Sequence, residues 1–279
     1  MTDTPFVSTA WLAEHLSDPD VAIVDGSWYL PAVNRDPRAE YLAGHIPGAI
    51  FFDVDQYADL STGLPHMLMQ SEAFGTLAGS LGIGDDMTIV VYDGMGLFSA
   101  PRVRWTFEAM GAKHVFILDG GLPKWRAEGR PLEAGEARRS PTTFKVSFDA
   151  AGVASLDQMQ AYSQDGARQI ADARPGLRFR GEAPEPRPGL KSGHMPMAKS
   201  APADTLVENG TLKPVETLRA QFAEAGIDLD KPIVTTCGSG VTAATLKLAL
   251  EQAGAKDVVL YDGAWAEWGG RDDTEVLKG

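Results

Sequence analysis

The pattern that decides the fold occurs twice in this chain: GIGDDMTIVVYDGMG at residues 82–96 and GIDLDKPIVTTCGSG at residues 226–240. Two further pairs follow the same order in both halves: AGHIPGA (43–49) with SGHMPMA (192–198), and GAKHVFILDGGLPKW (111–125) with GAKDVVLYDGAWAEW (254–268). A repeat this long indicates a duplicated domain, because solenoid units span only roughly 20–50 residues. The sequence therefore predicts two copies of one domain.

Each copy alternates short apolar runs with helical patterns. The predicted strands are VAIVD (21–25), MTIVVYD (87–93) and HVFIL (114–118) in the first copy, and RQIAD (168–172), PIVTT (232–236) and DVVLY (257–261) in the second. Uninterrupted β-branched runs between helices are typical of strands buried on both faces of a parallel sheet. We therefore expect an α/β fold of two tandem domains, each a mostly parallel sheet flanked by helices.

A polar stretch with two prolines and mixed charge, RPLEAGEARRSPTTF at residues 130–144, separates the two copies. Such composition is typical of domain boundaries. The predicted organisation is a first domain at residues 1–135, a linker at 136–150 and a second domain at 151–279.

The charge and cysteine content narrow the possible environments and partners. The chain of 279 residues has a formal net charge of −13 and a single cysteine. This charge argues against nucleic acid or an anionic membrane surface as a partner, and an anionic substrate would need a local basic pocket. The N-terminal residues lack a secretory signal pattern, no apolar run approaches the roughly 20 residues of a membrane span, and one cysteine excludes an internal disulfide. We expect a cytoplasmic protein.

The single cysteine, Cys237, follows a predicted strand and precedes a predicted helix, within CGSG. Gly238 and Gly240 allow the backbone to turn so that amide N–H groups point inward, and the helix N-terminus adds partial positive charge. Both effects favour a thiolate at Cys237, which predicts a reactive nucleophile. The alternative is a small, inert core residue. The second copy alone carries the thiol, because Asp93 occupies the equivalent position in the first.

A cysteine phosphatase would use a similar loop. Such enzymes need an arginine six positions after the cysteine to hold the phosphate oxygens. Ala243 stands at that position here, so phosphatase activity is disfavoured.

The motifs together resemble a known family. GHIPGA, SAPRVRWTFEAMGAKHVFILDGGLPKW, RFRGEAPEPRPGLKSGHMP and YDGAWAEW are similar to segments of two-domain rhodanese-like sulfurtransferases, and the resemblance covers almost the whole chain. Within that family, CGSGVT at residues 237–242 resembles the 3-mercaptopyruvate branch. The thiosulfate branch typically carries basic residues directly after the cysteine.

The resemblance implies a sulfur-transfer reaction without a metal or organic cofactor. Cys237 would take sulfur from 3-mercaptopyruvate, release pyruvate and carry a persulfide, which a thiol acceptor such as thioredoxin or a small thiol, or cyanide, would then discharge. Backbone amides of the loop would stabilise the persulfide anion. These amides belong to Gly238, Ser239, Gly240, Val241 and Thr242.

The resemblance also implies two arginines that hold the substrate's carboxylate and carbonyl oxygens. The matching positions in RFRGEAPEPR are Arg178 and Arg187, and a guanidinium suits a planar 2-oxo acid better than an ammonium does. Most arginines lie solvated on protein surfaces, and Arg180 is an alternative to either residue.

A proton relay is implied through Ser239, His45 of GHIPGA and Asp36. Release of pyruvate passes through an enolate, so a proton donor beside the loop is chemically reasonable. The alternatives are a structural role for His45, as its echo His194 suggests, and one of three other acids in place of Asp36: Asp25, Asp53 and Asp55.

One position departs from the family pattern. Met197 stands in GHMPMA where Gly48 stands in GHIPGA, so either the turn is strained there or it is rebuilt. The five histidines and one cysteine show no metal-ligand spacing, and no metal site is expected.

Two rival functions remain open from the sequence. One is a thiosulfate:cyanide sulfurtransferase that uses the same cysteine. The other is a noncatalytic persulfide carrier or redox sensor that passes sulfur to a protein partner.

Overall fold

The computed structural model describes residues 4–279, which form two compact units. Unit 1 contains the chain up to Asp59, Leu68–Asp149 and Asn209–Thr211; unit 2 contains Leu60–Met67, Ala150–Glu208 and Leu212–Gly279. Each unit therefore includes a short segment from the other half of the chain. Among residues 4–279, every helix is too short or too polar to cross a bilayer.

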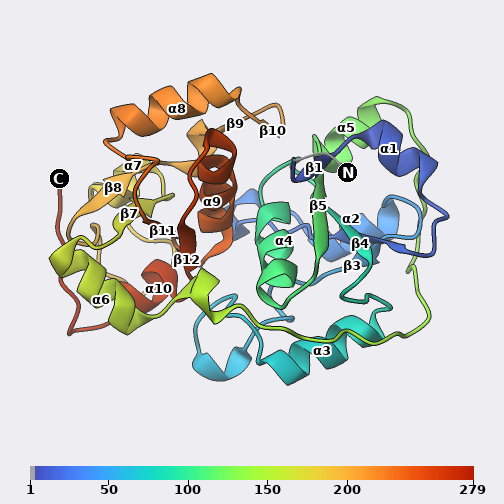
Figure 1. Cartoon of the computed structure of the whole chain (residues 1–279), viewed down its shortest axis with the longest axis horizontal. Coiled ribbons are helices and arrows are strands. Elements are labelled where there is room, and N and C mark those ends of the chain that lie inside the picture. Colours follow the sequence, from blue (N-terminus) through green and yellow to red (C-terminus); the bar gives the residue numbers. More distant parts are fainter. Residues whose placement is uncertain (1–3) are drawn as a thin grey trace. The chain divides into compact units, whose positions relative to one another are not determined.

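Unit 1 is built on a five-stranded sheet in the order β1-β5-β4-β2-β3, and all neighbouring pairs are parallel (Figure 1). Its strands are β1 (Phe6–Val7), β2 (Val21–Asp25), β3 (Ile50–Phe51), β4 (Thr88–Tyr92) and β5 (His114–Leu118). Strands β2 and β4, at the centre, are apolar runs with nearly every residue buried. This burial is the reason that their sequences do not alternate.

Unit 2 repeats this arrangement in the order β6-β12-β11-β7-β8, again with parallel pairs. Its strands are β6 (Val153–Ala154), β7 (Gln169–Asp172), β8 (Ala198–Ser200), β11 (Ile233–Thr236) and β12 (Val258–Tyr261). A separate two-stranded ladder joins β9 (Val207–Glu208) and β10 (Thr211–Leu212). The matching strand orders confirm the predicted α/β fold and its internal repeat.

Helices flank both sheets. In unit 1 they are α1 (Thr9–Glu14), α2 (Pro37–Ala43), α3 (Ser71–Ser80), α4 (Ala100–Ala109) and α5 (Gly121–Ala127); in unit 2 they are α6 (Leu156–Asp165), α7 (Gly176–Phe179), α8 (Val215–Glu224), α9 (Val241–Ala253) and α10 (Ala264–Trp268). Single 3-10 turns occur at Pro31–Val33, Leu60–Thr62, Ala150–Gly152 and Ala203–Thr205. Helix α9 packs against β11 and β12, and α8 packs on α9.

Equivalent tryptophans fill the two cores, as the repeat predicts. Trp125 packs in a cluster with Val90 and Tyr92 of β4. Trp268 packs with Val234 of β11 and Tyr261 of β12. Each indole N–H donates to a backbone carbonyl, which satisfies its single polar group inside the core.

The stretch after α5, expected to act as a linker, packs along unit 1. The guanidinium of Arg139 donates to the carbonyl oxygens of Pro19, Val21 and Gly82 at 2.9–3.1 Å. Phe144 is buried against the ring of Phe74. Backbone and side-chain contacts therefore fix this segment on the surface of unit 1.

The turn after His194 keeps the backbone of its first-half counterpart. Met197 has φ +62° and Gly48 has φ +74°, so both positions are left-handed. Because a β-carbon is strained in this conformation, the methionine is accommodated by strain and not by a rebuilt turn.

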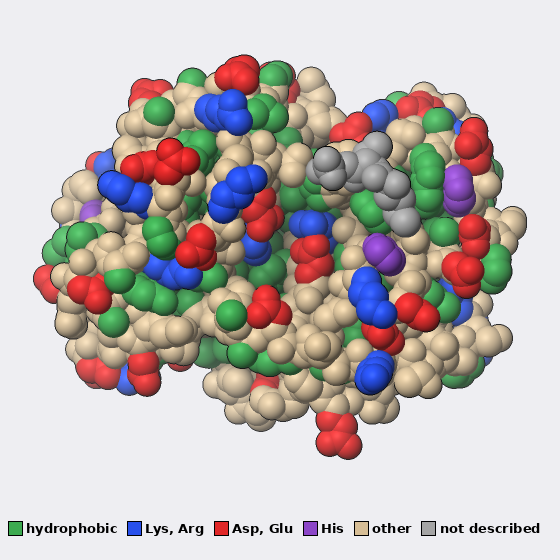
Figure 2. All heavy atoms as spheres, viewed as in Figure 1, with side chains coloured by type: hydrophobic (Ala, Val, Ile, Leu, Met, Phe, Trp, Pro, Cys, Tyr) green, Lys and Arg blue, Asp and Glu red, His purple; other side chains and the backbone are tan. Residues whose placement is uncertain are grey.

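Charged side chains of both signs lie on the face of the molecule that Figure 2 shows. On this face, acidic and basic side chains are interspersed and no broad basic area is visible (Figure 2).

Candidate active site

Cys237 occupies the turn between β11 and α9, as the sequence predicts. Helix α9 begins at Val241, and Gly240 precedes it with φ +82°, a left-handed conformation that favours glycine. The thiol-bearing residue is only 2% exposed. The carboxyl end of a central parallel strand is the usual place for a ligand site in such a sheet.

Helix α10 fixes this loop from one side. The amide of Trp265 donates to the carbonyl oxygen of Cys237 at 2.8 Å, and the amide of Ala266 donates to that of Gly238 at 3.0 Å. Because a trans peptide directs its N–H opposite to its C=O, the amides of Gly238 and Ser239 point away from α10. The loop thus presents consecutive donors on its other side.

Backbone strain accompanies this contact. Ala264 is fully buried and has φ +52°, whereas the equivalent residue in unit 1 is Gly121. A non-glycine residue in this region costs on the order of 1–2 kcal/mol. The surrounding packing of α10 therefore holds the loop in place against a local penalty.

The equivalent loop of unit 1 holds an anion of its own. Asp93 stands at the position of Cys237 and is 1% exposed. Its carboxylate accepts from four backbone N–H groups at 2.7–2.9 Å, those of Met95, Phe98, Ser99 and Ala100. In unit 1 this part of the repeat therefore surrounds a negative charge with amide donors, although α4 begins seven residues after Asp93 whereas α9 begins four residues after Cys237.

His66 reaches the cysteine loop from the segment Leu60–Met67, which belongs to unit 2. Its Nδ1 lies 3.1 Å from the carbonyl oxygen of Ser239, and the residue is 5% exposed. A carbonyl oxygen can only accept, so Nδ1 is the donor in this hydrogen bond. The sequence analysis missed this residue, because GLPHMLMQ carries no pattern beyond the turn signal of Gly63 and Pro65.

His45, the histidine expected in the relay, has structural contacts in unit 1. It is fully buried, its Nδ1 donates to the carbonyl oxygen of Tyr41 at 2.9 Å, and its ring stacks on that of Tyr41. His194 repeats these contacts in unit 2, with the carbonyl oxygen and ring of Phe179. The shared contacts match the structural alternative that its echo suggested, whereas Nε2 of His45 is buried and makes no hydrogen bond with any residue that the structure describes.

The acids considered for the relay also have local partners. Asp36 caps helix α2 by accepting from the amide of Ala39 at 3.0 Å. Asp55 accepts from the indole N–H of Trp28 at 3.0 Å. Asp25 is buried beside Ser27, and burial raises its pKa to about 6.

Of the predicted arginines, Arg178 is brought to the loop. Its Nη2 lies 3.0 Å from the place where a β-carbon on Gly238 would be, so glycine at that position admits the guanidinium. Arg180 instead pairs with Glu182 at 2.8 Å, and its side chain is 43% exposed. Arg187 lies partly exposed between α7 and β8.

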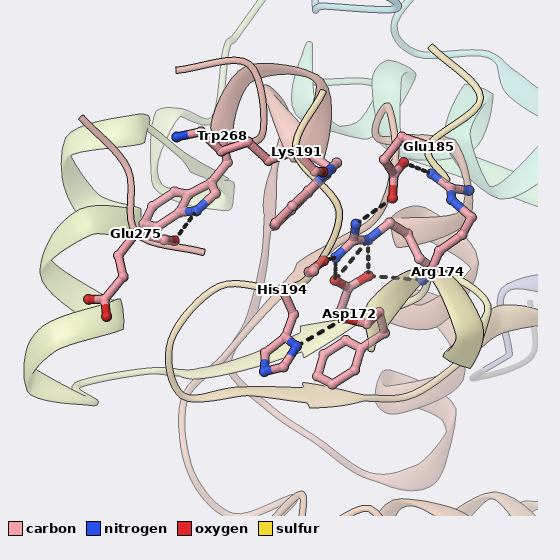
Figure 3. Close-up of polar contacts among 11 residues, drawn as sticks. Asp172, Arg174, Glu185, Lys191, His194, Trp268 and Glu275 are labelled. Atoms are coloured by element: carbon pink, nitrogen blue, oxygen red, sulfur yellow. Dashed lines mark hydrogen bonds and ion pairs between the residues drawn. The ribbon is translucent and has the colours of Figure 1, made fainter. Parts of the chain in front are cut away.

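A buried chain of ion pairs supports this side of the loop (Figure 3). Arg174 pairs with Asp172 at 2.6 Å and with Glu185 at 2.8 Å, and Glu185 also pairs with Arg178. Burial alone would lower the pKa of Arg174, but the two carboxylates outweigh it and the pKa is raised. Arg174 therefore stays charged inside the protein.

No cluster of three or more His, Cys, Asp or Glu side chains suited to a metal ion occurs within residues 4–279. The chemistry that the described residues offer is that of a thiol nucleophile, amide donors, a histidine and arginines.

Comparison with known proteins defines the class of this chain. Residues 8–128 and 155–271 each match the rhodanese-like domain. The two matches cover most of the chain, which therefore belongs to the rhodanese-like family as a protein with two such domains.

Individual relatives show which members of the rhodanese-like family this chain resembles. The chain is 43% identical over 277 residues to a protein of Escherichia coli K12 named 3-mercaptopyruvate sulfurtransferase, covering 99% of each chain. It is 43% identical over 297 residues to an Arabidopsis thaliana protein named Thiosulfate/3-mercaptopyruvate sulfurtransferase 1, mitochondrial, covering 99% of this chain and 78% of that protein. The crystal structure of SseA from Escherichia coli, described as a 3-mercaptopyruvate sulfotransferase, matches with a TM-score of 0.87 and 41% identity over 94% of this chain and 99% of that one.

Proposed function

We propose that this chain is a 3-mercaptopyruvate sulfurtransferase, an enzyme that moves sulfur through a persulfide on Cys237 and releases pyruvate. The observation that carries the proposal is a single cysteine at the carboxyl end of β11, at the position where unit 1 has Asp93, whose carboxylate accepts from four amides. The similarity to sulfurtransferases of the rhodanese-like family over nearly the whole chain supports it.

The reaction proceeds in two displacements. The Cys237 thiolate attacks the sulfur of 3-mercaptopyruvate, an S–S bond forms, and the C–S bond breaks. The bonding electrons leave as the enolate of pyruvate, which takes up a proton at carbon. An acceptor thiolate or cyanide then attacks the outer sulfur, breaks the S–S bond and restores the Cys237 thiolate.

The loop stabilises the anions of both steps. Backbone N–H groups of Gly238, Ser239, Gly240, Val241 and Thr242 are the proposed donors. Donors fixed in advance need no reorganisation when negative charge develops, so they lower the barrier more than solvent would. The carboxylate of Asp93 in the equivalent loop supports this role, since it satisfies the same kind of donors permanently.

Proton delivery to the enolate is assigned to Ser239 with His66. The hydrogen bond from Nδ1 of His66 to the Ser239 carbonyl supports this assignment, because it holds the imidazole beside the loop. The contacts of His45 and Asp36 support structural roles for those two residues, and variants of His45 and His66 separate the two assignments.

Arg178 and Arg187 bind the carboxylate and carbonyl oxygens of the substrate. The position of Arg178 against Gly238 supports its part in this site. A guanidinium presents parallel N–H groups that match a planar 2-oxo acid edge.

Thiosulfate as the donor is the second candidate. The Arabidopsis relative carries both donors in its name, which favours testing them together. The loop of this chain has no basic residue between Cys237 and Thr242, whereas the thiosulfate branch typically carries basic residues there. This difference favours 3-mercaptopyruvate. A noncatalytic persulfide carrier would form the persulfide without efficient turnover of either donor.

For the acceptor, we propose a thiol such as thioredoxin or a small thiol, or cyanide. The cytoplasm is the proposed location, in keeping with a lone cysteine that a reducing compartment preserves.

The test is turnover of 3-mercaptopyruvate and of thiosulfate with a dithiol or cyanide acceptor, with Cys237→Ser as the control. Preference for 3-mercaptopyruvate, lost in the variant, supports the proposal. Preference for thiosulfate transfers the assignment to the other donor and leaves the persulfide step standing. No turnover of either donor favours the carrier.

A further inference from the structure

Glu185 lies between two arginines at the edge of the candidate site. Its side chain is 1% exposed. Oε1 accepts from Nη1 of Arg174 at 2.8 Å, and Oε2 accepts from Nη2 of Arg178. A carboxylate this deeply buried is unfavourable unless both oxygens are paired, so the two guanidinium groups account for its presence.

One of the two arginines is immobilised. Arg174 is inaccessible to solvent, and its Nε and Nη2 donate to the carboxylate of Asp172. Nη2 also donates to the carbonyl oxygen of Gly193 at 2.8 Å, and the guanidinium lies 3.9 Å from the ring centroid of Trp265. With this many contacts, Arg174 fixes the Oε1 end of Glu185 (Figure 3).

Arg178, the other arginine, has an N–H donor that no protein group accepts within the described residues. Nη2 of Arg178 meets Glu185 and lies beside Gly238, directly after the nucleophile. Its Nε is inaccessible to solvent and makes no hydrogen bond with any residue in the described part of the chain. A buried N–H without a partner is costly, and the oxygen of a bound ligand would satisfy it.

We propose that Glu185 is a positioning residue for Arg178. Arg174 holds one of its oxygens, and the other oxygen holds the guanidinium of Arg178 against the loop before substrate arrives. Fixing this side chain in advance reduces the ordering cost of binding. The identity of the ligand, a 2-oxo acid, rests on the proposed function; the coupling of Glu185 to Arg178 does not.

The variant that tests this is Glu185→Gln. The amide has the same shape, but it lacks the charge and turns an NH2 group toward one of the guanidiniums, where donor faces donor. We expect KM for 3-mercaptopyruvate to rise roughly tenfold to hundredfold while kcat changes by less than about threefold, because the lost interaction is made in the ground state. The matched control is Glu182→Gln, which breaks the exposed pair with Arg180 and should leave both constants unchanged.

A double-mutant cycle separates positioning from a general structural effect. If Glu185 acts through Arg178, then Glu185→Gln adds nothing to the rise in KM that Arg178→Met already causes. An additive effect in the Arg178→Met background, or an unchanged KM in Glu185→Gln alone, overturns the proposal.

A crystal structure of Glu185→Gln provides a readout that does not depend on the reaction. Displacement of the Arg178 guanidinium from Gly238 supports the positioning role, and an unmoved guanidinium overturns it. If the wild-type protein turns over no 3-mercaptopyruvate, the proposed function fails, and the position of Arg178 in the variant still decides the role of Glu185.

Discussion

His66 and Ser239 meet across 173 residues of sequence, with Nδ1 of the imidazole 3.1 Å from the serine carbonyl oxygen. The histidine precedes α3 in the first half of the chain, yet its segment, Leu60–Met67, belongs to unit 2. The cysteine loop is therefore supported by a side chain that the second repeat does not encode.

Because of this contact, we expect substitution of His66 to lower kcat and substitution of His45 to leave kcat unchanged. His66→Asn places a side-chain amide near the position of Nδ1, so it preserves a donor to Ser239 but removes the second ring nitrogen. If that nitrogen takes part in proton delivery, kcat for 3-mercaptopyruvate should fall by about 10² or more, since general acid–base groups contribute roughly 10²–10⁴. Steady-state kinetics with a dithiol acceptor measures this.

The matching control is His45→Asn. Its ring is fully buried on Tyr41, so the substitution should lower the melting temperature while folded enzyme keeps the wild-type kcat. A large loss of kcat in His45→Asn, together with wild-type activity in His66→Asn, would return the relay to His45.

The substrate arginines predict a change in KM. Arg187→Ala should raise KM for 3-mercaptopyruvate by roughly tenfold or more, because a charge-assisted hydrogen bond contributes about 1.5–3 kcal/mol. Arg180→Ala is the comparison, since Arg180 pairs with Glu182 at the surface and should leave KM unchanged. A rise in KM with Arg180→Ala and none with Arg187→Ala would exchange their assignments.

Asp93 should matter for stability and not for chemistry. Its carboxylate accepts four backbone N–H groups, and Asp93→Ala would leave all four unpaired, those of Ser99 and Ala100 in the buried interior. We expect the free energy of unfolding to fall by about 3 kcal/mol or more, since each unsatisfied buried group costs on the order of 1–3 kcal/mol. Urea titration measures this loss. Asp53→Ala, which removes an acceptor of two exposed turn amides, should cost much less.

The left-handed turn repeated in both halves allows a reciprocal test. Met197→Gly should stabilise the protein by up to about 1 kcal/mol, because relief of φ strain exceeds the extra backbone entropy of glycine. Gly48→Ala should destabilise it by a similar amount, as no atom within 4 Å of the new β-carbon offers a contact. Thermal unfolding of both variants and of the wild type tests this expectation. If both variants melt at the wild-type temperature, the turn carries no strain.

Structural features that are set by short, contiguous stretches of sequence could be predicted. The apolar runs of β4 and β11 and the glycines after them are local, so the parallel sheets, the duplication and the loop around Cys237 follow from short windows. Arg178 could be selected as a substrate-binding residue only because its motif resembles that of a known family. His66 and Glu185 could not be found this way, because their importance arises from contacts made by the folded chain. The GHIPGA motif also drew attention to His45, and the His45→Asn variant tests its predicted part in the relay.

Asp25 predicts a pH dependence of stability. It is buried at the end of β2, and burial raises its pKa from 3.8 to about 6. Between these values the folded state binds a proton that the unfolded state has released, so the free energy of unfolding falls as pH rises through this window. The loss amounts to about 3 kcal/mol, at roughly 1.4 kcal/mol per pH unit. Above the folded pKa this contribution stays constant.

Asp25→Asn removes the titrating group and keeps an oxygen that can accept from Ser27. The variant should therefore be more stable than the wild type at pH 7, and this advantage should disappear as the pH approaches 4. Urea unfolding of both proteins at several values between pH 4 and pH 7 measures the difference. A constant difference across that range would mean that Asp25 does not titrate there, and that its burial is compensated equally in both charge states.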